Sequence, residues 1–125
     1  MGSIQSEHYE DVQIVNVINE YTVELEFYEE NDENKNKENN KEKTKRNLVV
    51  TLKGIQPYDW TILEELNRSK NARTVIYGLK STNKKLIAEI FKTEGLTPEC
   101  ILTEKKTGIN INHWLITMGH VRKKK

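Results

Sequence analysis

Hydrophobic and polar residues alternate along the first part of the chain in the manner of β-strands. In residues 22–28, the side chains of Val23, Leu25 and Phe27 fall on one face, with glutamates between them on the other. Residues 9–18 are rich in valine and isoleucine, and only a short turn-like link separates the two stretches. Strands joined by so short a link form a hairpin, so we predict two antiparallel strands here.

A third alternating stretch, residues 48–53, leads into a bend and then into a helix. Gly54 and Pro57 interrupt the strand pattern directly after it. Apolar residues in the segment 59–71 then recur at helical spacing, which predicts a helix. Asp59 stands at the start of that segment and is expected to act as its N-cap.

The second half of the chain predicts two further strands and a final helix. Residues 73–79 and 86–91 are short apolar runs with a lysine-rich turn between them, so we expect each to form a strand. Residues 93–108 contain glycine and proline without a sustained period, which predicts a long loop. Asn110 is suited to cap a last helix, and Gly119 is suited to end it.

One charged segment stands apart from the rest of the chain. Residues 29–46 consist almost entirely of Glu, Asp, Asn and Lys, and have no apolar side chain to offset the entropy of ordering them. We predict a disordered insert in a surface loop; a charged tether for a partner is the functional alternative. The rest forms a single domain over residues 9–121, between a disordered N-terminus (1–8) and a basic tail (122–125).

Composition narrows the class of protein. The net charge of +1 is too small to indicate nucleic-acid binding by itself. The single cysteine, Cys100, excludes an internal disulfide, and it has no histidine motif that would indicate a catalytic thiol. No apolar run reaches transmembrane length, so we expect a cytoplasmic or nuclear protein without a membrane partner. Both tryptophans are expected in the core and all three histidines outside any metal site: Trp60, Trp114, His8, His113 and His120.

The order of the predicted elements indicates a fold. Three strands, a helix, two strands and a helix are the layout of the OB-fold, a five-stranded Greek-key barrel with added helices. OB domains bind ligands on strands two and three and on the loops that join strands one to two and four to five. In this chain the equivalent surface is predicted to bind nucleic acid through a set of polar residues: Tyr21, Lys53, Lys80, Asn83, Lys84 and Lys85, with Thr51 on its floor. Lysines pair with phosphates without reading bases, so binding of single-stranded RNA or DNA should be weak and sequence-tolerant.

Four segments resemble the staphylococcal (micrococcal) nuclease-like family. Residues 50–59 read V-T-L-K-G-I-Q-P-Y-D and resemble the family's V-R-L-x-G-I-D-x-P-E, and residues 17–25 resemble its V-I-D-G-D-T-V-x-L hairpin. Residues 84–90 resemble G-R-x-L-A-x-V, the start of its fifth strand, and residues 111–121 resemble V-N-x-W-L-V-x-x-G-x-A, its second helix. The resemblance implies a nuclease-like OB domain of order β-β-β-α-β-β-α. It suggests a protein of the Tudor-staphylococcal-nuclease type.

The resemblance also implies where catalytic residues would stand. Active members hold calcium with two aspartates, activate water with a glutamate and stabilise the transition state with two arginines. Tyr21 and Gln56 occupy the two calcium positions, Asp59 occupies the glutamate position, and Thr51 and Lys85 occupy the arginine positions. An amide is a weak calcium ligand, and neither threonine nor lysine offers the planar fork of arginine. We therefore expect neither catalysis nor a cofactor at this site.

The sequence thus predicts a catalytically inactive nuclease-like OB domain that serves as an RNA- or protein-binding module of a larger RNA-associated protein. One alternative is a calcium-dependent phosphodiesterase with a reorganised site at Glu20, Asp59 and Lys85. Another is a purely structural domain that docks on a protein partner or on neighbouring domains. If nucleic acid binds, the basic tail 122–125 is the site that competes with the predicted groove.

Overall fold

Five strands close into a barrel within the part of the chain that the computed structural model describes, residues 5–30 and 43–124. The barrel strands follow the order β1-β2-β3-β6-β5. Their bounds are β1 (Gln5–Asn19), β2 (Thr22–Glu30), β3 (Lys43–Leu52), β5 (Leu86–Lys92) and β6 (Glu99–Glu104). Two helices, α1 (Leu63–Ser81) and α2 (Ile111–Thr117), and a small sheet of β4 (Ile55–Gln56) and β7 (Arg122–Lys123) complete these elements. A closed five-stranded mixed barrel with two helices is consistent with an OB-like architecture.

The alternating pattern of the sequence becomes the barrel core. Val23, Leu25 and Phe27 of β2 point inward and are buried, which confirms the inward face of the second predicted strand. β1 is long enough to pair with β2 at one end and with β5 at the other. Its register shifts between Tyr9 and Val12, where Asp11 has a positive φ of 57°. This irregularity lets one strand bend between two partners, as β-bulges do in barrels.

The strands reach further into the charged segment and the N-terminus than we expected. β2 runs to Glu30 and β3 begins at Lys43, so both ends of the predicted insert 29–46 are paired strand. Opposite charges face each other there, and Nε of Arg46 lies 2.7 Å from Oε2 of Glu29. The rest of that predicted insert, 31–42, lies outside the described residues, as do residues 1–4 and 125. β1 begins at Gln5, inside the N-terminal segment 1–8.

The prediction for the region after β3 is wrong in three places. α1 runs from Leu63 to Ser81, so the helix expected at 59–71 is shifted and residues 73–79 are helical rather than a fourth strand. β5 is therefore the fourth strand of the barrel rather than the fifth. The fifth is β6, which lies inside the predicted loop 93–108. The helix extends through residues 73–79 because a helical period outweighs the strand-like alternation there. The buried residues of α1, which are Ser69, Ala72 and Ile76, recur at spacings of three and four.

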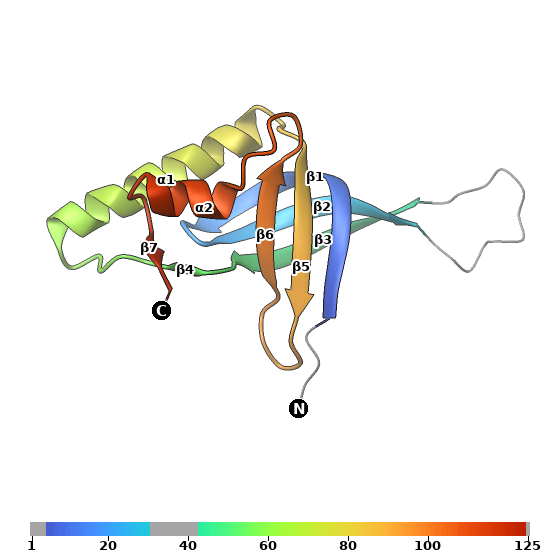
Figure 1. Ribbon diagram of the computed structural model, residues 1–125, viewed down its shortest axis with the longest axis horizontal. Coiled ribbons are helices and arrows are strands. Elements are labelled where there is room, and N and C mark those ends of the chain that lie inside the picture. The colour runs from blue at the N-terminus through green and yellow to red at the C-terminus, as the bar shows by residue number, and fades with distance from the viewer. Residues whose placement is uncertain (1–4, 31–42, 125) are drawn as a thin grey trace, which may run out of the picture.

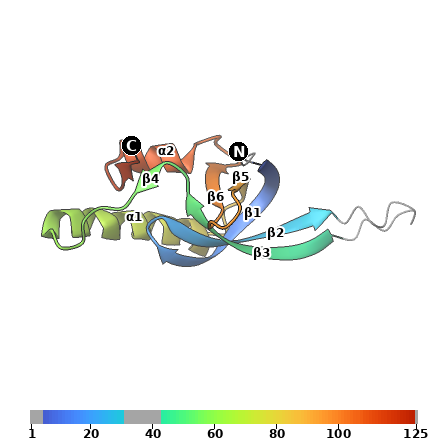
Figure 2. The same ribbon diagram turned by 90° about the horizontal axis from the view of Figure 1, so that it is seen from below.

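Both helices lie at the end of the barrel away from the hairpin that β2 and β3 extend (Figures 1 and 2). α1 packs against β1, and α2 packs against β6. The side chain of Asn110 accepts a hydrogen bond of 3.0 Å from the backbone N–H of His113, which confirms the predicted N-cap of α2. Trp114 packs half-buried against the core, whereas Trp60 lies before α1 and is 52% exposed, so its assignment to the core was wrong.

Candidate functional site

A pocket of about 470 Å³ opens at one end of the barrel. It is lined by residues from the β1–β2 turn, the ends of β3 and β4, the start of β6 and the segment after β7: Tyr21, Thr51, Leu52, Ile55, Gln56, Pro57, Glu99 and Lys124. Three of these, Tyr21, Thr51 and Gln56, are positions that the sequence singled out. We call this site the barrel-end pocket.

The course of β3 explains why a pocket forms here. β3 pairs with β6 in parallel over only two positions, Thr51 with Glu99 and Leu52 with Cys100. The chain then turns at Gly54, whose φ of +81° is strained for any residue with a Cβ atom. β4 leaves the barrel and pairs instead with β7. The barrel-end pocket lies where these two sheets diverge.

Tyr21 is held rigidly at the mouth of the barrel-end pocket. Its backbone N–H donates a hydrogen bond of 2.9 Å to Oδ1 of Asn19, which fixes the tight turn between β1 and β2. Its carbonyl oxygen accepts a hydrogen bond of 2.7 Å from the backbone N–H of Leu52. The ring is half-buried and packs against the core. An aromatic ring in the lining of a pocket is a suitable platform for stacking.

Near the point where β3 and β6 separate, the side chain of Asn112 in α2 bridges backbone groups of the two chain segments. Its side chain accepts a hydrogen bond of 3.0 Å from the backbone N–H of Leu102. Its amide also donates to the carbonyl oxygens of Lys53 and Cys100, at 3.0 and 2.9 Å. Asn112 is 4% exposed, so this buried amide replaces backbone bonds that the short β3–β6 pairing does not supply.

The barrel-end pocket offers hydrogen-bonding groups with little net charge. Among the described residues of its lining, Glu99 is the one carboxylate and Lys124 the one cation. Calcium takes six to eight oxygen ligands, and carboxylates supply most of its affinity. Among the side chains that the structure describes, no group of three or more His, Cys, Asp or Glu residues could hold a metal ion. What the lining can do is hydrogen-bond and stack on a polar ligand.

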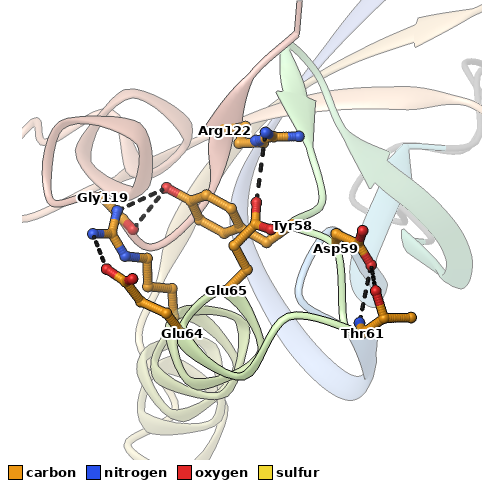
Figure 3. A network of polar contacts seen from close by, with 8 residues as sticks. Tyr58, Asp59, Thr61, Glu64, Glu65, Gly119 and Arg122 are labelled. Carbon is orange, nitrogen blue, oxygen red and sulfur yellow. Dashed lines mark hydrogen bonds and ion pairs between the residues drawn. The ribbon is translucent and has the colours of Figure 1, made fainter.

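The two carboxylates of the phosphodiesterase alternative are each engaged elsewhere. Glu20 is fully buried; its Oε1 accepts a hydrogen bond of 2.9 Å from Nε1 of Trp60, and its Oε2 has no partner among the described atoms. Asp59 is exposed, and its Oδ1 accepts hydrogen bonds from Oγ1 and the backbone N–H of Thr61, at 2.7 and 2.9 Å (Figure 3). These two bonds, the side-chain bond first, hold the pKa of Asp59 below its usual value.

Asp59 stabilises a turn rather than the helix itself. The N-cap of α1 is Ile62, which makes no side-chain capping bond, so the assignment of Asp59 as N-cap was wrong by three positions. The backbone N–H of Ile62 donates to the carbonyl oxygen of Asp59 at 3.2 Å, which closes a turn directly before α1. The carboxylate thus organises the entry to the helix, a role typical of Asp in turns.

A cluster of polar side chains next to Asp59 connects α1 to the segment after α2 (Figure 3). The hydroxyl of Tyr58 donates a hydrogen bond of 3.1 Å to the carbonyl oxygen of Gly119. Nη2 of Arg122 lies 3.5 Å from Oε1 of Glu65, and the guanidinium of Arg122 lies 5.6 Å from the centre of the Tyr58 ring. The predicted basic tail 122–125 is therefore in part a strand, because Arg122 and Lys123 form β7.

The predicted lysines do not join the barrel-end pocket. Lys80 lies in the last turn of α1, and Asn83, Lys84 and Lys85 lie in the link from α1 to β5. That link is at the Leu86 end of β5, which pairs with Glu104, whereas the pocket is at the Phe91 end, which pairs with Glu99. Figure 1 shows the link at the top of the barrel and the β5–β6 loop at the bottom.

Lys53 also stays apart from the pocket lining, and its Nζ lies 4.8 Å from the centre of the Phe91 ring. The structure therefore brings together Tyr21, Thr51 and Gln56 but separates them from the lysines at 80–85. Sequence reasoning missed Glu99, and it assigned Lys124 to a competing basic tail rather than to this pocket. The alternation of Cys100 and Leu102 within β6 was the signal that could have located Glu99.

No family model, curated protein or solved structure matches the chain. In the described part of the chain, neither helix has the length and apolar character that crossing a membrane requires.

Proposed function

We propose that the chain is a catalytically inactive, nuclease-like OB domain that binds single-stranded nucleic acid without cleaving it, as one module of a larger RNA-associated protein. The position of the barrel-end pocket carries this proposal. The pocket lies between the β1–β2 turn and the start of β6, directly after the loop that joins the fourth and fifth barrel strands. OB domains bind oligonucleotides at this combination of loops.

The family-like segments support the nuclease-like part of the proposal with one exception. Residues 17–25 span the β1–β2 turn, residues 50–59 span the exit from β3, and residues 111–121 begin with α2. Residues 84–90 fall on the fourth barrel strand, so Lys85 does not stand where the resemblance put it. The fifth barrel strand begins at Glu99, a negative side chain that would repel a phosphate where catalysis needs a cation.

The residues that line the pocket are better suited to binding a ligand than to catalysing a reaction. Tyr21 offers an aromatic surface on which any base can stack, and Thr51 and Gln56 offer hydrogen bonds to polar edges. A volume of about 470 Å³ is within the usual range for sites that take a small molecule or part of a larger one. Lys124, the cation among the described lining residues, can pair with one phosphate. Binding through this pocket alone should therefore be weak and sequence-tolerant.

A protein partner is the second candidate, and a specific observation favours it. Three apolar side chains at the entry to α1 are unusually exposed: Trp60 at 52%, Ile62 at 49% and Leu63 at 72%. Exposed apolar side chains that gather on one surface often mark a protein contact. A partner that docks on the entry to α1 would be sensitive to Leu63→Ser and indifferent to Tyr21→Ala.

The proposal is tested by incubating the protein with labelled single-stranded RNA and DNA in the presence of calcium. We expect the oligonucleotides to remain intact and Tyr21→Ala to weaken their binding roughly tenfold, because one stacked base is lost. Tyr28→Ala is the matched control, since Tyr28 is an exposed tyrosine on β2 outside the pocket. Calcium-dependent cleavage that disappears in Asp59→Ala would overturn the proposal, as would binding that Tyr21→Ala and Tyr28→Ala weaken equally.

A further inference from the structure

One face of α1 concentrates positive charge in a chain that is otherwise balanced. The protein has 20 basic and 19 acidic residues, yet residues 66–88 include no aspartate or glutamate. The basic residues of this stretch are Arg68, Lys70, Arg73, Lys80, Lys84 and Lys85. A net charge of +1 for the whole chain therefore conceals a local positive field around α1 and the link that follows it.

The helix brings three of these basic side chains together with a tyrosine on one surface. Lys70, Arg73 and Tyr77 are spaced by three and four residues, so they are neighbours on the same side of α1. Together with Thr74 they line a surface depression of about 240 Å³. Lys80 continues the row, and its Nζ lies 6.0 Å from the centre of the Tyr77 ring. We call the set Lys70, Arg73, Tyr77 and Lys80 the α1 basic face.

The cations of the α1 basic face are not neutralised by neighbouring acids. Across the residues whose side chains the structure describes, Lys70, Arg73 and Lys80 make no ion pair with a carboxylate. The two acidic residues of α1 are engaged elsewhere: Glu64 pairs with Arg68 at 3.2 Å and Glu65 with Arg122 at 3.5 Å. The row from Lys70 to Lys80 spans about 15 Å of rigid helix, the length of a few nucleotides.

We propose that the α1 basic face holds the phosphodiester backbone of a single-stranded nucleic acid, with Tyr77 stacking on a base. The inference rests on the proposed nucleic-acid function but assigns it a second surface. Tyr77 is 49% exposed between the cations, which suits a ligand that alternates negative charge with flat rings. An acidic peptide would satisfy the charges and leave the ring unused. Of the lysines that the sequence predicted as nucleic-acid contacts, Lys80 belongs to this surface, and Lys84 and Lys85 lie in the link that follows α1.

The test compares two charge-neutralising double variants by fluorescence anisotropy with a labelled mixed-sequence RNA of about 16 nucleotides. Lys70→Gln/Arg73→Gln removes two phosphate contacts, so the slope of log affinity against log salt should fall by about 1.4. At about 0.1 M salt that loss corresponds to a roughly 25-fold weaker affinity. Lys43→Gln/Lys45→Gln removes the same charge from β3 and should change affinity less than about twofold. Equal effects of the two double variants would overturn the inference.

Tyr77 distinguishes a nucleic acid from an acidic partner. Tyr77→Ala should weaken RNA binding roughly tenfold at an unchanged salt slope, and Tyr77→Phe should keep wild-type affinity because the ring remains. Polyglutamate should compete with the RNA only poorly at equal concentration of charge. Competition as strong as that of unlabelled RNA, together with full affinity in Tyr77→Ala, would assign the α1 basic face to an acidic peptide and overturn the inference.

The outcomes separate this inference from the proposed function. Wild-type protein that binds no RNA even at low salt contradicts both. Binding that weakens in Tyr21→Ala but not in Lys70→Gln/Arg73→Gln contradicts the α1 basic face alone. The opposite result supports the α1 basic face and contradicts the barrel-end pocket. Thermal unfolding of each variant verifies that it is folded, which matters most for Tyr21→Ala because the Tyr21 ring packs against the core.

Discussion

The two helices lie at the same end of the barrel but differ in whether the buried polar atoms near them have hydrogen-bond partners. On the α2 side, the side chain of Asn112 makes two hydrogen bonds to the backbone of β6 and one to the carbonyl oxygen of Lys53, directly after β3. On the α1 side, three buried polar atoms have no hydrogen-bond partner among the described residues: Oε2 of Glu20, Oγ of Ser69 and Nε of Arg73. All three belong to α1 or to the β1–β2 turn.

This difference indicates which side of the molecule is optimised for stability. The buried amide of Asn112 has all its hydrogen bonds and so fixes α2 to the barrel. A buried polar atom without a partner instead lowers the free energy of unfolding, because its lost hydration is not replaced. Proteins tolerate such atoms mostly at functional regions. The α1 side also carries the half-exposed Trp60, the α1 basic face and one wall of the Tyr58 cluster. The buried amide of Asn112 therefore makes α2 a structural anchor of the barrel, whereas the binding surfaces proposed above lie at the barrel-end pocket and on α1.

The largest effect is expected from Asn112→Ala. The change leaves the N–H of Leu102 and the carbonyl oxygen of Lys53 without a partner, while the carbonyl oxygen of Cys100 keeps its bond from the N–H of Lys53. We expect the free energy of unfolding to fall by about 2–4 kcal/mol in urea denaturation. Asn110→Ala, which removes only the N-cap of α2, should cost about 1 kcal/mol. Similar losses in both variants would contradict the anchoring role of Asn112.

A smaller loss is expected from Trp60→Phe. Phenylalanine keeps an aromatic ring but removes the N–H that bonds Glu20, which leaves both oxygens of a buried carboxyl group without a partner. The expected cost is about 1–3 kcal/mol of unfolding free energy. The control is Trp60→Phe made in a Glu20→Leu background, where no hydrogen bond to residue 20 remains to be lost. If Trp60→Phe costs as much in that background as in the wild type, the bond to Glu20 contributes nothing.

Ser69→Ala should have the smallest effect, and with the opposite sign. The hydroxyl of Ser69 is fully buried on the inner face of α1 and has no partner in the described structure, so its removal deletes an unmet polar group. Alanine also favours the helix slightly. We expect stability to stay the same or to rise by up to about 1 kcal/mol in the same denaturation experiment. A clear loss of stability would mean that the α1 side is satisfied in solution and would remove the contrast with Asn112.

The barrel and α2 were largely predictable from the sequence. Strict alternation in residues 22–28 is compatible only with a half-buried strand. Asn110 and Gly119 mark the start and the end of a helix through local capping interactions, which do not depend on tertiary contacts. Asn112 was part of a recognised segment. Its bonds to Lys53 and Leu102, however, depend on where two strands diverge. Such an arrangement is tertiary and leaves no signature in local spacing.

The region around α1 was predictable only in part, and the error there affected the prediction of the candidate site most. Val75 and Tyr77 alternate over a run too short to separate strand from helix, and the helical period of Ser69, Ala72 and Ile76 prevailed because it buries a continuous face against β1. That single error moved the lysines at 80–85 to the wrong loop. Tyr21, Thr51 and Gln56 do lie together in the lining of the barrel-end pocket, because they stand at the turn of the hairpin and at the exit from β3.

The most direct test of nucleic-acid binding without cleavage is a titration of ¹⁵N-labelled protein with a short single-stranded RNA, at low salt and with calcium, followed by backbone amide shifts. We predict shift changes at residues 19–22, 51–57 and 99 around the barrel-end pocket and at residues 70–80 on α1, with the RNA intact at the end of the titration. Shift changes confined to residues 122–124, no changes at all, or RNA that is shortened in a calcium-dependent way would contradict it.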